Sequence, residues 1–194
     1  MRKQLQRLFL CLIILALSTE NSFCQKGAFM AYGSLNYSHN NKSGSQFSAS
    51  PIGLGYFFND HIVAGMNYGF NRVTNGESIK VNNQHEVGPF YSDSWSLGEH
   101  FFFIAQLDTH YLWGDNLNSD QSRHSYNGYL ARLYPIVAVN LGHGWALKAK
   151  FCELSFQSTK EKDSNDGRNN NFIAGINGST LGMGVSKNFF LYKK

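Results

Sequence analysis

Apolar and polar residues alternate with a period of two along almost the whole chain after residue 27. Of all the features of the sequence, this alternation most strongly restricts the folds that the chain can adopt. Successive side chains of a β-strand point to opposite faces, so each alternating run predicts a strand with one apolar and one polar side. Eight runs show the pattern, over residues 28–38, 46–58, 62–71, 85–96, 100–113, 125–140, 145–156 and 172–190. The sequence therefore predicts an all-β fold of eight antiparallel strands.

The connections between the predicted strands alternate between short and long. Short turns, for which Asn, Asp and Gly are favoured, are expected at residues 59–61, 97–99 and 141–144. Long polar connections are expected at residues 39–45, 72–84, 114–124 and 157–171. Short turns on one side and long loops on the other are typical of outer-membrane β-barrels, in which an even number of strands brings both chain ends to the same side.

Pro51, Pro89 and Pro135 fall within three of the predicted strands, each at a similar distance before a short turn. Proline has no N–H group to donate to a neighbouring strand, so it is usually kept out of paired strands. We therefore expect a local bulge at each of the three prolines.

The polar faces of the predicted strands carry charged and amide side chains, whereas the opposite faces carry rows of Leu, Ile, Phe and Tyr. The polar set includes Asn67, Gln106, Asp108, His110, Arg132, Lys148 and Lys150. A soluble barrel would enclose the apolar rows. Enclosing the charged rows instead is favourable where lipid surrounds the barrel. A membrane-spanning β-structure must also be closed, because hydrocarbon offers no hydrogen-bond partner to the backbone groups of an open edge.

The tryptophans are placed as a membrane-spanning barrel would require. Trp95 and Trp145 flank the short turns, and Trp113 lies near a long connection. This placement fits two aromatic girdles, one at each membrane interface.

The N-terminal residues predict export. Arg2, Lys3 and Arg7 precede an apolar run over residues 8–17, and small and polar residues follow it, which is typical of a secretory signal peptide. The run is too short to span a bilayer, which needs about 20 residues. Removal of residues 1–24 would leave residues 25–194 as one outer-membrane β-barrel domain and lower the formal charge from +4 to +2. The remaining Lys and Arg form no stripe, so no nucleic-acid partner is expected.

Several stretches make the chain resemble the small eight-stranded outer-membrane β-barrels of Gram-negative bacteria, the OmpA/OmpX-like group. They are residues 51–65, 89–90 with 97–98 and 101–103, 135–148 and 181–189, and the likeness covers nearly all of residues 27–189. The resemblance implies an eight-stranded antiparallel up-and-down transmembrane β-barrel. It also implies insertion by the barrel-assembly machinery, which recognises an apolar final strand. Leu181, Met183, Val185 and Phe189 match that signal.

Five polar-face residues form the candidate site. Asp108 and His110 lie on one predicted strand, and Arg132, Lys148 and Lys150 lie on the two that follow. They could form a proton relay, an ion path or a small-ligand site. We favour a salt-bridge network that fills the lumen, because eight strands leave an interior just wide enough for side chains and buried charges need partners.

No catalytic residue, cofactor or metal site is expected. Serines are many, no Ser/His/acid spacing singles out a set, and no Cys or His pair has ligand spacing. The sequence thus predicts a monomeric, non-enzymatic outer-membrane protein with a structural role in the envelope, whose partners are outer-membrane lipids and the barrel-assembly machinery. The alternative is adhesion or ligand binding by the long loops. A narrow porin-like channel and a lipid-modifying barrel enzyme are two further hypotheses.

Overall fold

The computed structural model describes residues 26–40, 44–74, 80–117, 122–162, 167–175 and 182–189, so the predicted signal peptide lies outside the described residues. The strands are β1 (Phe29–Gly33), β2 (Leu35–Asn40), β3 (Gly44–Phe57), β4 (Ile62–Thr74), β5 (Lys80–Ser96), β6 (Phe101–Leu117), β7 (Arg123–Gly142), β8 (Trp145–Lys150), β9 (Glu153–Glu161), β10 (Asn169–Gly175) and β11 (Gly182–Phe189). Within these ranges, no helix is long and apolar enough to cross a membrane.

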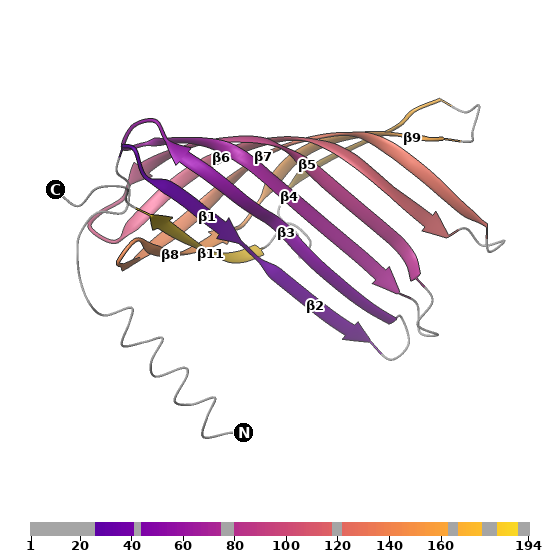
Figure 1. The fold of residues 1–194 in the computed structure, drawn as a ribbon, viewed down its shortest axis with the longest axis horizontal. Helices are drawn as coiled ribbons and strands as arrows, with labels where there is room; N and C mark the ends of the chain where they lie inside the picture. The colour runs from indigo at the N-terminus through magenta and orange to yellow at the C-terminus, as the bar shows by residue number, and fades with distance from the viewer. Residues whose placement is uncertain are drawn as a thin grey trace, which may run out of the picture.

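Neighbouring strands pair in antiparallel fashion, and the pairing closes on itself. β1 pairs with β3, each strand from β3 to β7 pairs with the next, β7 pairs with β8, and β8 pairs with β11. β11 returns to β1, where Phe29 lies opposite Phe189 and Gly33 lies opposite Val185. Eight strands thus form one hydrogen-bonded ring, and its short turns gather at one end (Figure 1).

The eight predicted strands correspond to this arrangement, but three of them are divided. β1 and β2 are interrupted at Ser34, and β8 and β9 at residues 151–152. β10 and β11 are separated by residues 176–181, which lie outside the described residues. Beyond the closed part of the ring, β2 continues the pairing with β3 and β10 pairs with β9.

The long connections are shorter than the sequence pattern predicted. Strands occupy parts of all four predicted connections, 39–45, 72–84, 114–124 and 157–171, so those predicted bounds are wrong. The prediction ended each strand where the apolar alternation stopped. Pairing with a neighbouring strand satisfies backbone N–H and C=O groups whatever the side chains are, so Asn- and Ser-rich segments continue the ladders.

The prolines interrupt the ladders in three different ways. Pro51 lies within a register shift between Ala49 and Ile52, where a bulge was expected. Pro135 faces the break between β8 and β9, because β7 pairs with β9 up to Leu133 and with β8 from Ile136. At Pro89 the β5–β6 ladder skips two residues without a change of register, so the bulge expected there is wrong.

The two faces of the ring have opposite character. The outer face carries exposed large apolar side chains along every strand of the ring, including Leu54, Met66, Leu107, Leu133 and Val185. The enclosed face carries buried Asn67, Glu86, Gln106, Asp108 and His110. Apolar residues occupy other parts of the interior in two clusters, one of Ala28, Met30, Phe57, Val63 and Phe90 and one of Ile104, Tyr134, Ile136, Ala138 and Ala146. The orientation predicted from the sequence agrees with this arrangement.

The close approach of β5 and β6 at Gly88 provides a test of the ladder. A Cβ atom on Gly88 would collide with the Thr109 carbonyl oxygen. We predict that Gly88→Ala lowers the free energy of unfolding by about 1–3 kcal/mol, the usual cost of overpacking. Urea titration of the refolded protein, followed by tryptophan fluorescence, measures the change. Gly167→Ala is the control, since a Cβ there meets nothing within 4 Å; equal midpoints for the two variants would contradict the close approach.

Candidate functional site: the enclosed polar cluster

Eight polar side chains from five strands meet inside the ring, and we call them the lumen cluster. Alternate residues of a strand share a face, which is why Gln106, Asp108 and His110 of β6 all point inward. The other members come from β1, β4, β5 and β7: Tyr32, Asn67, Glu86, Arg132 and Tyr134.

Arg132 holds the two carboxylates of the lumen cluster. Its Nη2 donates to Glu86 Oε1 at 2.6 Å and lies 3.6 Å from Asp108 Oδ2. All three side chains are largely buried, with 13% of Arg132, 6% of Glu86 and 1% of Asp108 exposed. Buried ions are tolerated when they are paired and hydrogen-bonded. One guanidinium therefore compensates the charges of two carboxylates, which lie on the neighbouring strands β5 and β6.

His110 lies between Arg132 and Asn67. Its Nδ1 is 3.1 Å from Arg132 Nη2, and its Nε2 contacts Asn67 Oδ1. His110 Nδ1 also lies 3.5 Å from Glu86 Oε1. The imidazole is thus enclosed by Arg132, Glu86 and Asn67.

Hydrogen bonds extend the lumen cluster from Asp108 to Tyr32. The Tyr134 hydroxyl donates to Asp108 Oδ2 at 2.7 Å, and Gln106 Nε2 donates to Asp108 Oδ1 at 2.9 Å. Gln106 Nε2 also lies 3.1 Å from the Tyr32 hydroxyl, which accepts a further bond from Asn67 Nδ2 at 2.9 Å. A continuous network therefore ties β1 to β4, β6 and β7 across the interior.

The five residues predicted from the sequence divide into two groups. Asp108, His110 and Arg132 lie in the lumen cluster. Lys148 Nζ lies 3.3 Å from Met30 Sδ and 5.1 Å from the centroid of the Tyr32 ring. Lys150 Nζ donates to Glu153 Oε2 at 2.7 Å and lies 5.2 Å from the centroid of the Tyr134 ring. Both lysines thus border the cluster through its tyrosines.

Sequence reasoning did not select Glu86, Tyr32 and Tyr134 for the site. Glu86 is the carboxylate closest to Arg132, and its inward position could have been read from the alternation of the strand that contains it. The two tyrosines resemble the outward apolar rows in residue type, and the structure alone shows that their hydroxyls point into the network.

The lumen cluster fills space and joins strands. Its members present no serine, threonine or cysteine nucleophile. Among the described residues, no group of three His, Cys, Asp or Glu side chains is placed to hold a metal ion. The arrangement is chemically suited to cross-linking β4, β5, β6 and β7 through charge-assisted bonds.

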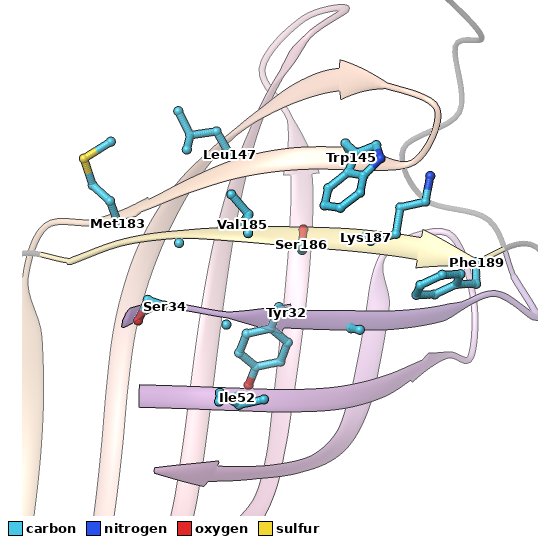
Figure 2. A pocket seen from close by; sticks show the side chains of 13 residues that line it. Tyr32, Ser34, Ile52, Trp145, Leu147, Met183, Val185, Ser186, Lys187 and Phe189 are labelled. Atoms are coloured by element: carbon cyan, nitrogen blue, oxygen red, sulfur yellow. The ribbon is translucent and has the colours of Figure 1, made fainter. Parts of the chain in front are cut away.

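A groove of about 760 Å³ lies on the outer wall, where β1 meets β11 (Figure 2). Its lining includes the small residues Ala31, Gly33 and Gly184, with larger Ile52 and Leu147 on the neighbouring strands. Lys187 and Trp145 lie side by side at one end, with Lys187 Nζ 5.2 Å from the centroid of the Trp145 ring (Figure 2). The groove is thus apolar along its length and carries a positive charge at the end with the short turns.

Comparison with solved structures defines the class of fold: a closed antiparallel β-barrel. One similar structure is the crystal structure of the N-terminal β-barrel domain of Pseudomonas aeruginosa OprF, with a TM-score of 0.50 and 16% sequence identity. The match covers 86% of this chain and 99% of that domain. No protein-family model and no curated protein sequence matches the chain. The OprF domain therefore supports the fold alone.

Arg132 is the residue whose loss should most affect the lumen cluster. Arg132→Met removes the only guanidinium that touches Glu86 and Asp108 among the described contacts. Two buried carboxylates then lack their cation, and we predict a loss of about 3–5 kcal/mol in the free energy of unfolding. Urea titration in detergent micelles measures it.

Arg123→Met is the matched control for this prediction. Arg123 also pairs with an aspartate, Asp115, but 44% of its side chain is exposed. Exposed ion pairs contribute about 0–1 kcal/mol. A loss for Arg132→Met no larger than that for Arg123→Met would show that the buried network does not stabilise the ring.

Proposed function

We propose that this chain is an integral β-barrel protein of the bacterial outer membrane, whose side-chain-filled interior gives it a structural role in the envelope. The observation that carries the proposal is the inverted arrangement of side chains: exposed apolar rows around the whole ring and a charged network within it. Monomeric soluble proteins rarely expose contiguous apolar patches larger than a few hundred Å². Lipid is the surrounding that stabilises such a wall.

The aromatic residues of β6 support this environment. Phe101 and Trp113 point outward 12 residues apart, and the outward residues between them carry no charge. Twelve residues span about 40 Å of strand, which at a tilt of about 40° crosses about 30 Å. That height is close to the roughly 25 Å apolar band of outer-membrane barrels, which aromatic girdles flank on both sides.

The positively charged end of the outer groove fits the same orientation. Lys187 donates to the His143 carbonyl in the turn between β7 and β8, so its charge is held at the short-turn end. Lysine next to tryptophan at that level is typical of a membrane interface, where the alkyl stem contacts apolar groups and the ammonium reaches water. Outer-membrane lipids, and the barrel-assembly machinery during insertion, are the partners in this proposal.

A lysine placed on the outer wall distinguishes a membrane protein from a soluble one. Leu107 is exposed in the middle of β6. In a bilayer we predict that Leu107→Lys lowers the free energy of unfolding by about 2–4 kcal/mol, the cost of a lysine at the midplane. Urea titration in phospholipid vesicles measures it, with heat-modifiable gel migration reporting the folded state.

Leu97→Lys is the matched control, because Leu97 is exposed in the short turn between β5 and β6. A lysine near the interface costs about 0–1 kcal/mol. In a soluble protein both lysines would be tolerated equally, so equal stabilities of the two variants would remove the membrane proposal.

The filled interior also predicts a closed pore. Protein inserted in a planar bilayer should show no single-channel conductance, because the lumen cluster and the two apolar clusters occupy the ring interior. A porin inserted in the same bilayer is the positive control. Reproducible unitary currents from folded protein would favour the narrow-channel hypothesis instead. The loop hypothesis, adhesion or ligand binding, falls partly on residues outside the described ranges.

A further inference from the structure

The rim of the ring, away from the short turns, brings a serine, a histidine and a glutamate together. Ser122 Oγ lies 2.8 Å from His124 Nε2, and Glu161 Oε2 lies 3.8 Å from His124 Nδ1. The serine and the glutamate therefore lie next to different ring nitrogens of the same imidazole. We propose that these residues form a serine hydrolase site for small, water-soluble carboxylic esters.

The β-structure explains how the three residues meet. Ser122 immediately precedes β7, and His124 is the second residue of that strand. At this spacing of two residues Ser122 Oγ reaches His124 Nε2. Tyr126 pairs with Glu161 of β9, which makes Glu161 the diagonal neighbour of His124 on the same face. Diagonal neighbours lie about 7–8 Å apart and are within reach of a long side chain. The bond from Lys162 N to Ser125 O, 2.9 Å long, continues the ladder past Glu161 and holds it in register.

The geometry suits nucleophilic catalysis. A serine becomes a nucleophile when a histidine within hydrogen-bond reach accepts its proton and a third group orients the histidine. The Ser122–His124 contact meets this condition directly. The His124–Glu161 separation is longer than a hydrogen bond, and such contacts commonly tighten when substrate binds.

Water and substrate can reach this site. His124 and Glu161 have 33% and 48% of their side chains exposed. The even-numbered residues of β7, such as Tyr126 and Leu130, are buried within the ring, so the same alternation places His124 on the inner side of the rim. A site on the inner side favours an ester dissolved in water over one embedded in the surrounding lipid.

Asn116 is the donor that this arrangement offers to the developing oxyanion. It lies directly opposite His124 in the β6–β7 ladder, on the same face. Its NH₂ group is the hydrogen-bond donor that this position offers to a substrate oxygen, as asparagine side chains do in other serine hydrolases.

The reaction balances with water as the co-reactant. Ser122 Oγ forms a bond to the ester carbonyl carbon as its proton passes to His124 Nε2, and the carbonyl electron pair moves onto oxygen. The ester C–O bond then breaks, His124 protonates the leaving alcohol, and the acyl group stays on Ser122. Water attacks this acyl group with His124 as base, and Ser122 regains its proton as the carboxylic acid leaves.

A fluorophosphonate probe tests the nucleophile independently of turnover. In folded, detergent-solubilised full-length chain, Ser122 Oγ should attack the phosphorus and release fluoride, which leaves a phosphonylated Ser122 that peptide mass spectrometry identifies. Ser122→Ala should abolish the labelling, and His124→Asn should slow it by at least about 100-fold, the usual contribution of a general base. Ser125→Ala, at an exposed serine of β7, should label like the wild type.

Hydrolysis of p-nitrophenyl butyrate tests the roles of the other residues. Asn116→Ala should lower kcat by about 100-fold, as loss of one oxyanion donor does. Glu161 acts through His124 as a positioning residue, so Glu161→Gln should lower kcat by at least about tenfold with KM unchanged, and Glu161→Asp should restore part of it. His143→Asn, at the opposite end of the ring, should leave hydrolysis unchanged.

Every variant is first checked for heat-modifiable migration, so loss of activity is separated from loss of folding. Absence of labelling in folded wild-type protein would overturn the proposal, as would equal labelling of wild type and Ser122→Ala. The membrane proposal is tested by lysines on the outer wall and does not depend on either result.

Discussion

Five backbone-paired positions between β1 and β11, from Phe29–Phe189 to Gly33–Val185, turn a sheet into a ring. Every strand edge that they join would otherwise expose N–H and C=O groups, which a bilayer cannot satisfy. The same closure separates an enclosed face from an outer face. The period-two alternation therefore directs polar residues into the ring and apolar residues away from it. The small outward residues Ala31 and Gly33 also lie in this ladder, and the outer groove follows their path. The seam that closes the ring thus also carries the outer groove.

Closure with so few strands limits what the interior can contain. A ring of eight leaves room for side chains only, and a charged side chain in that space must find its partner among the other strands. Arg132 meets this condition by facing Glu86 and Asp108, while Gln106 and Tyr134 donate to the two oxygens of Asp108. Apolar residues occupy two other parts of the interior. Not every buried polar group is paired in this way, since Ser186 Oγ has no hydrogen-bond partner among the described residues.

The alternation was sufficient to predict the strands, the positions of the short turns and the inward direction of Asp108, His110 and Arg132. It could not predict how far the strands continue, because backbone pairing beyond Arg72 or Asp115 does not require apolar side chains. It also could not predict partners. Glu86 and Arg132 are 46 residues apart, and their contact depends on the registers of two successive ladders. Glu161 was missed for the same reason, since only the β7–β9 ladder brings it close to His124.

His110 and His124 show how one ring of strands gives two histidines different chemical environments. Both lie on inward faces, and both have a carboxylate near Nδ1. His110 is enclosed, and both of its ring nitrogens contact buried groups, Nδ1 the Arg132 guanidinium and Nε2 the Asn67 amide. His124 reaches water, and its Nε2 faces a hydroxyl that can be deprotonated. Position along the strand, rather than residue type, therefore separates a structural histidine from one able to act as a base. A barrel can in this way keep a closed interior and carry a reactive site at its rim.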